Sequence, residues 1–190
     1  MNMINRPESD LGGIDMQKTI VRSLCYCAFL TALAVLLQSA PVFLPLAGMA
    51  LSPLATFPVA LACFESKALG AASYAAAGLI LLLISPEESL IFFFTTGIMG
   101  IPLGIYTRSF IKSIAVTMGF LFGGMNALTF LAGVSIFGDM TPNASFFSSL
   151  MPYLLFSAGY AAVWTLIIKY LTRILAKRGI SGGDNLRKKM

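Results

Sequence analysis

The chain has 190 residues, of which 57% are hydrophobic and 11% are charged, and its mean hydropathy is +0.84. A soluble domain carries about 25% charged residues, so this composition cannot cover a water-facing surface and predicts an integral membrane protein. The formal net charge of +5 does not indicate nucleic-acid binding, because the basic residues lie at the ends of apolar segments and in the C-terminal tail.

The apolar segments predict an all-α fold, a bundle of six transmembrane helices, since a membrane-spanning helix needs about 20 apolar residues. Residues 1–16 are polar and unpatterned, and we expect a flexible cytoplasmic tail there rather than a signal peptide. The six-helix domain is expected over 17–176 and a basic cytoplasmic tail over 177–190. The expected spans are about 20–39, 43–64, 67–84, 88–107, 113–137 and 149–171.

The positions of the basic residues predict the orientation of these spans. With six crossings, every Lys and Arg falls on one side of the membrane, and the loops on the opposite side carry only Glu87, Glu88 and Asp139. The positive-inside rule then places both termini in the cytoplasm of a bacterial cell. The basic residues are Arg6, Lys18, Arg22, Lys67, Arg108, Lys112, Lys169, Arg173, Lys177, Arg178, Arg187, Lys188 and Lys189.

The segment SAPVFLPLAGMALSP, between the first and second spans, is apolar and rich in proline. Two interpretations stay open. It is either a lid packed over a pocket or an irregular start to the second span, which also contains Pro45, Pro53 and Pro58.

The segment SPEES, before the fourth span, has the pattern of a helix start. Ser85 suits the N-cap, Pro86 suits the first helical position, and Glu88 completes an S-x-x-E capping box. Glu87 and Glu88 are also favourable at the positive end of the helix dipole. The pair is therefore first a helix-start signal, and its predicted place on the outer side leaves a role at a gate open.

The sequence predicts no catalytic residue, no metal site and no cofactor. Histidine is absent, and none of the motifs GxxxxGK[ST], HExxH and GxSxG occurs. Cys25, Cys27 and Cys63 lie within apolar runs, where cysteine behaves as a small hydrophobe. We therefore expect a protein that is not an enzyme.

Small residues spaced four apart recur along the spans and permit close approach of helices in lipid. Each pair is consistent with ordinary packing inside the bundle, but Ala28 and Ala32 lie in the cytoplasmic half of the first span, where a partner can dock. The other pairs are Ala71 and Ala75, Gly100 and Gly104, Gly119 and Gly123, and Ala158 and Ala162.

Polar and aromatic residues in the outer halves of the spans are the candidates for binding a small molecule. An asparagine at membrane depth needs a partner or a wet cavity, and an interhelical hydrogen bond is the alternative for Asn126. For the tyrosines near the surface the alternative is an interfacial anchor. The candidate substrate-binding residues are Gln38, Glu87, Thr95, Thr96, Asn126, Tyr153, Ser157, Tyr160 and Trp164.

With six short spans, cytoplasmic termini, no ATPase motif and the AxxxA of CAFLTALAVLL, the chain resembles the substrate-binding S components of energy-coupling-factor (ECF) vitamin transporters. It is also similar to six-span bacterial membrane proteins with a PVALACFESKALGAASYAAAG segment. The ECF resemblance implies uptake of a vitamin-like micronutrient, docking of Ala28 and Ala32 on a transmembrane coupling subunit, and paired ATPases. Nickel and cobalt are disfavoured as substrates, because the corresponding S components use an N-terminal histidine.

The alternative from a different class is a multi-span scaffold protein of cell-envelope morphogenesis or sporulation, with no transport role. A membrane enzyme ranks third, because the chain has no histidine and no intramembrane pair of acids.

Overall fold

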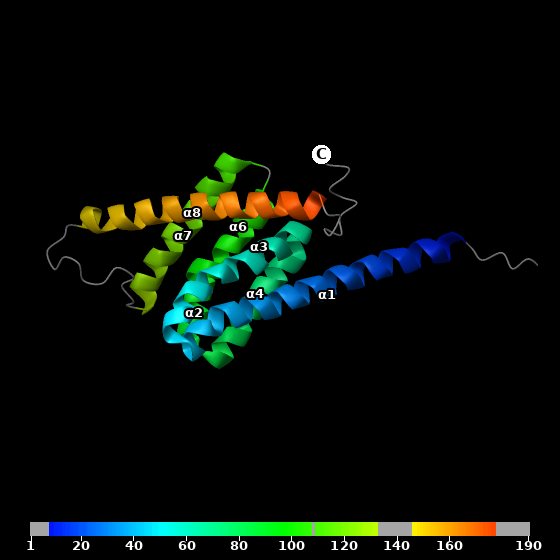
Figure 1. Cartoon of the computed structure of the whole chain (residues 1–190), viewed down its shortest axis with the longest axis horizontal. Coiled ribbons are helices and arrows are strands. Elements are labelled where there is room, and N and C mark those ends of the chain that lie inside the picture. Colours follow the sequence, from blue (N-terminus) through cyan, green and yellow to red (C-terminus); the bar gives the residue numbers. More distant parts are fainter. Residues whose placement is uncertain (1–7, 108, 133–145, 178–190) are drawn as a thin grey trace, which may run out of the picture.

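The protein is an all-helical, multi-span membrane protein over the residues that its computed structural model describes, which are 8–107, 109–132 and 146–177. Six helical segments in these ranges are long and apolar enough to cross a bilayer (Figure 1). Large apolar side chains such as Leu46, Leu83 and Ile111 point outward, with at least 80% of their surface exposed. Such an exterior is suited to lipid and not to water.

The first span is part of the 36-residue helix α1 (Glu8–Phe43), which extends well beyond the bundle in Figure 1. The helix begins inside the segment expected to be a flexible tail. The physical reason is cooperativity, since a nucleated helix gains one hydrogen bond for each residue added. Residues 1–7 of that expected tail lie outside the described ranges.

The second span consists of three consecutive segments: α2 (Pro45–Leu51), the 3-10 segment η1 (Ser52–Ala55) and α3 (Thr56–Glu65). Only Leu44, with φ −134° and ψ 80°, separates α2 from α1. The proline-rich segment is thus the irregular start of a span, and the structure has no lid loop between residues 40 and 56. Pro53 lies at the start of η1, where its missing N–H leaves no hydrogen bond unmade.

The third span, α4 (Lys67–Ile84), has the bounds expected from the sequence. The fourth consists of α5 (Pro86–Ile91), the π-helical segment η2 (Phe92–Thr96) and α6 (Gly97–Ile105). Ser85 caps α5 as predicted, because its side chain accepts the Glu88 N–H at 3.4 Å. The π-helical segment is a feature that the sequence did not predict.

The last two spans are α7 (Phe110–Ala132) and α8 (Phe146–Lys177). Expectations for Asp139, for the end of the fifth span beyond Ala132, and for the tail from Arg178 onward fall outside the described residues.

The second and fourth spans form the centre of the bundle. Half or more of their residues are buried (50% and 56%), against 22–33% for the other spans. Helices α3 and α6 pack closely because Gly100 and Gly104 face Val59, Ala60 and Cys63, and a Cβ at either glycine would collide with them. This glycine pair is therefore used inside the bundle. Helix α1 packs on α3 and α4, and α8 packs on α7 (Figure 1).

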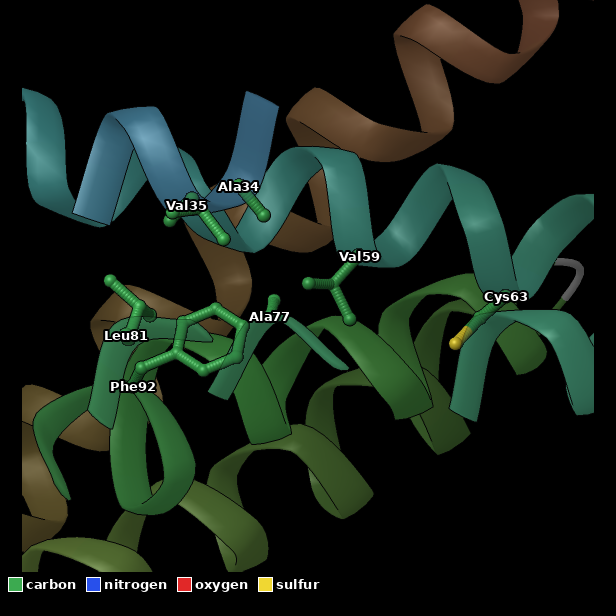
Figure 2. Packing of buried hydrophobic residues seen from close by; sticks show 8 residues of the cluster. Ala34, Val35, Val59, Cys63, Ala77, Leu81 and Phe92 are labelled. Carbon is green, nitrogen blue, oxygen red and sulfur yellow. The ribbon is translucent and has the colours of Figure 1, made fainter. Parts of the chain in front are cut away.

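Apolar side chains fill the space between these helices. One cluster joins α1, α3, α4 and η2, and Figure 2 shows Phe92 of η2 beside Leu81 and near Ala34 and Val35. A second cluster joins α6, α7 and α8, around Met99, Leu121 and Trp164. Full burial of one such side chain contributes about 1.5–3 kcal/mol in water, and in lipid the same close packing acts through dispersion.

The two ends of the bundle differ in charge. Ser23 Oγ donates to Glu65 Oε1 at 3.0 Å, which brings the part of α1 that carries Arg22 beside the junction at Lys67. Lys169 Nζ lies 5.4 Å from the ring centroid of Phe110, beside the start of α7. The described basic residues thus gather at one end, and we call it the basic end. Glu87 and Glu88 lie at the opposite end of α4 and define the carboxylate end.

Candidate functional site

The candidate site lies toward the carboxylate end, where the irregular segments η1 and η2 approach each other beside α1. A regular helix uses its own carbonyl groups as hydrogen-bond acceptors, whereas 3-10 and π-helical turns disturb that pattern. Inside a membrane the disturbed groups need partners from neighbouring helices. The two irregular spans therefore concentrate polar contacts in one region.

Four residues form a directed chain of hydrogen bonds in this region. Thr56 Oγ1 donates to the Thr96 carbonyl oxygen at 2.9 Å, and Thr96 Oγ1 donates to Gln38 Oε1 at 2.7 Å. Gln38 Nε2 then donates to Glu88 Oε2 at 2.8 Å. We call Gln38, Thr56, Glu88 and Thr96 the polar seam. It connects α1, α3, α5 and η2, so the first, second and fourth spans are joined by it.

Burial makes this chain energetically important. Gln38 and Thr56 are completely buried, and Thr96 is 8% exposed. A buried polar group without a partner costs about 1–3 kcal/mol, so each of these contacts offsets a penalty. The carboxylate fixes the direction of the chain, because an ionised carboxylate only accepts hydrogen bonds and Gln38 must turn its NH2 group toward it.

Neighbouring side chains satisfy other carbonyl groups around η2. Tyr74 Oη donates to the Phe93 carbonyl at 2.8 Å, and Thr95 Oγ1 donates to the Ile91 carbonyl at 2.5 Å. Ser89, also buried, donates to the Gly78 carbonyl at 2.9 Å. These contacts hold the π-helical turn in place and thereby hold Thr96 in the polar seam.

The structure brings together some of the residues predicted at this end and corrects the role of others. Gln38 and Thr96 meet directly, as a shared site requires. Thr95 lies beside them, but its hydroxyl is engaged within its own helix. Glu87 is exposed, and Glu88 is the carboxylate that reaches the seam. The sequence does not show which of two adjacent acids faces inward, because that depends on how the helix is rotated against its neighbours.

The capping box is only half formed. Ser85 caps α5, but its own N–H donates to the Leu81 carbonyl at 2.8 Å and the Glu88 side chain turns to Gln38 instead. Thr56 is the seam residue that the sequence analysis missed. Its position directly after the Pro53 turn was the available signal.

The remaining predicted residues lie in a different interface, between α7 and α8. Tyr153 and Trp164 are buried in the second apolar cluster, and Ser157 Oγ donates to the Tyr153 carbonyl at 2.6 Å. The Tyr160 ring lies 6.2 Å from the Trp164 ring. Asn126 Nδ2 donates to the Phe122 carbonyl of its own helix at 2.7 Å, whereas an interhelical hydrogen bond was the alternative to a binding role. These residues pack α8 on α7, and the polar seam is a separate group.

The polar seam is suited to hydrogen bonding with a polar ligand. It supplies one carboxylate, one oriented amide and two hydroxyl groups, with no nucleophile paired to a base. Within the described ranges no three His, Cys, Asp or Glu side chains are grouped to hold a metal ion. Comparisons of the chain with models of protein families, with characterised proteins and with solved structures find no match.

Proposed function

We propose that this protein is a membrane-embedded, substrate-binding subunit for uptake of a small organic micronutrient, energised by separate ATPases and a transmembrane coupling subunit. The polar seam carries the proposal. It is a preorganised polar group at one end of a small apolar bundle, formed where two spans are interrupted, and interrupted spans are where membrane transporters build their binding sites.

The surface of α1 supports the second half of this proposal. Ala28 and Ala32 are both exposed, so the small face that the ECF resemblance assigns to docking is not consumed by packing inside the chain. Both lie between Ser23, at the basic end, and Gln38, in the polar seam, and Ala28 is the nearer of the two to the basic end, which the positive-inside rule assigns to the cytoplasm. A coupling subunit approaching there can pack closely against the helix backbone.

The docking proposal is tested by co-expressing the chain with the coupling subunit and paired ATPases of the same genome. The double variant Ala28→Leu with Ala32→Leu is expected to lose co-purification, because the larger side chains hold the partner helix away. Ala71→Leu with Ala75→Leu is the matched control, since this pair has the same spacing and exposure on α4. If the wild-type chain binds neither the partner subunits nor a small molecule, the proposal is wrong.

A scaffold protein of cell-envelope morphogenesis or sporulation is the second candidate, and one observation favours it. A Cβ added at Gly119 or Gly123 on α7 meets no atom of the described residues within 4 Å, so this GxxxG face makes no close contact with them. Such a face is suited to association with another membrane helix. Under this alternative, the native membrane yields envelope proteins bound to the chain, and no small molecule is retained.

A further inference from the structure

The Glu88 carboxylate has no cationic partner that the described part of the chain can supply. Along α1 the nearest basic residue to Gln38 is Arg22, 16 residues away, which is about 24 Å in a helix. Lys67 is at the far end of α4, about 26 Å from Ile84. The charged group next to Glu88 is Glu87, which repels rather than compensates.

The Glu88 side chain is nevertheless held in one position by a buried neighbour. Its Oε2 atom accepts the hydrogen bond from the fully buried Gln38, whose orientation is fixed in turn by Thr96. Its Oε1 atom accepts no hydrogen bond from any residue in the described ranges. The side chain is partly buried and keeps part of its surface exposed. One oxygen is thus held by Gln38, and the other has no hydrogen-bond partner among the described residues.

A helix cap does not require this arrangement. The Ser85 hydroxyl already satisfies the Glu88 N–H, and Glu87 already places an acidic side chain in the first turn of α5. A partly buried carboxylate that faces no cation is costly, and it is more strongly attracted to an incoming cation than one in open water. The Glu88 carboxylate therefore has an affinity for a cation that its position in the helix cap does not explain.

We propose that Glu88, positioned by Gln38, is the recognition point for a small organic cation that carries N–H donors, such as a primary ammonium group or a protonated amine. The donor binds Oε1 while Gln38 occupies Oε2. The inference rests on the proposed function and narrows its substrate class. The same chemistry is found in lipid headgroups with a primary ammonium, and the test separates the two sources.

The test uses the full chain, purified into discs of phosphatidylcholine, whose headgroup has no N–H donor. The discs are incubated with an equimolar mixture of thiamin and pyridoxamine as cations, riboflavin as a neutral compound, and biotin and pantothenate as anions. Retained compounds are measured by mass spectrometry after desalting. The wild-type chain is expected to retain a cation.

Glu88→Gln is the informative variant, because glutamine also suits the third position of a capping box and preserves the start of the helix. It is expected to bind the retained cation about 10- to 100-fold more weakly, the range for losing a charge-assisted hydrogen bond. Glu65→Gln is the matched control: Glu65 also accepts a hydrogen bond from α1, but at the basic end. This control is expected to retain the cation like the wild-type chain.

The outcomes are distinct. Retention of riboflavin, biotin or pantothenate, with equal retention by Glu88→Gln, overturns the inference and leaves the proposed function standing. Retention of nothing by the wild-type chain overturns the inference, and it overturns the proposed function as well if the chain also fails to bind the partner subunits. If cations are retained in phosphatidylcholine discs but excluded when phosphatidylethanolamine is present, the headgroup ammonium is the occupant and Glu88 is still the recognition point.

Discussion

Two fully buried threonines differ in whether their hydroxyl groups have partners. Thr56 donates to the Thr96 carbonyl in the polar seam, whereas Thr117 Oγ1 on α7 has no hydrogen-bond partner within the described residues. Both side chains are 0% exposed, so burial is the same and only the hydrogen bond differs. Comparing the two threonines therefore distinguishes the stability contributed by a hydrogen-bonded hydroxyl group from the stability lost by burying an unpaired one.

Replacement of each threonine by valine is expected to have opposite effects. Thr56→Val leaves the Thr96 carbonyl without its donor and should destabilise the fold by about 1–2 kcal/mol. Thr117→Val removes an unsatisfied group at nearly constant volume and should raise stability by about 1 kcal/mol. Thermal unfolding of the detergent-solubilised protein, followed by circular dichroism, measures both. Equal loss of stability in the two variants would contradict the structure around Thr117.

The π-helical segment η2 depends on a close approach by α7. A Cβ added at Gly124 would coincide with the Phe94 carbonyl oxygen, so this oxygen already occupies the place of a side chain. Glycine is needed here for the approach of two backbones, and any larger residue must separate α7 from η2. Because Thr96 belongs to η2, the contact at Gly124 also bears on the polar seam.

Gly124→Ala is expected to destabilise the protein by about 1–3 kcal/mol through overpacking. Gly119→Ala and Gly123→Ala are the controls on the same helix, because an added Cβ at either position meets no atom within 4 Å in the described part of the chain. The controls should keep or slightly raise stability, since alanine favours a helix by up to about 1 kcal/mol over glycine. The midpoints of thermal unfolding of the three variants measure these changes in stability. Equal midpoints for Gly124→Ala and the two controls would refute the close contact with Phe94.

At the level of elements, periodicity and length predicted the third span to the residue, because Ser66 and Ser85 bound a continuous apolar run. The 3-10 and π-helical turns were not predictable in the same way. Residues 92–96 read FFFTT, which fits an ordinary helix, and their π geometry depends on Tyr74, Gly124 and Gln38 from other spans. Tertiary contacts of this kind leave no periodic pattern in the sequence.

The candidate site was predictable to a similar extent. The polar character of Gln38 and Thr96 at membrane depth identified two of its members, since such residues need partners. Nothing in the sequence separates these two residues from Tyr153, Ser157 and Tyr160, because all five were expected in the outer halves of their spans. Which polar residues share an interface depends on how each helix is rotated about its axis. In the structure, Gln38 and Thr96 face each other, whereas the residues of α8 face α7.

The whole molecule has a basic end and a carboxylate end, and this asymmetry predicts its orientation. Lys and Arg near span ends are retained on the cytoplasmic side, so the end with Lys67 and Lys112 is expected inside the cell and Glu87 outside. This orientation also decides whether the polar seam faces incoming substrate or the cytoplasm. Uptake from outside requires the carboxylate end to be the outer one.

Single-cysteine labelling tests the orientation. In a background with Cys25, Cys27 and Cys63 changed to alanine, Glu87→Cys should react with a membrane-impermeant maleimide in intact cells. Lys112→Cys should react only after the membrane is opened, and both positions are exposed side chains at opposite ends of the bundle. The reversed pattern would place the polar seam on the cytoplasmic side, where it cannot receive a substrate from outside, and would exclude uptake through it. Labelling of both positions in intact cells would refute the six-span topology, because in that topology one crossing, the fourth span, separates Glu87 from Lys112.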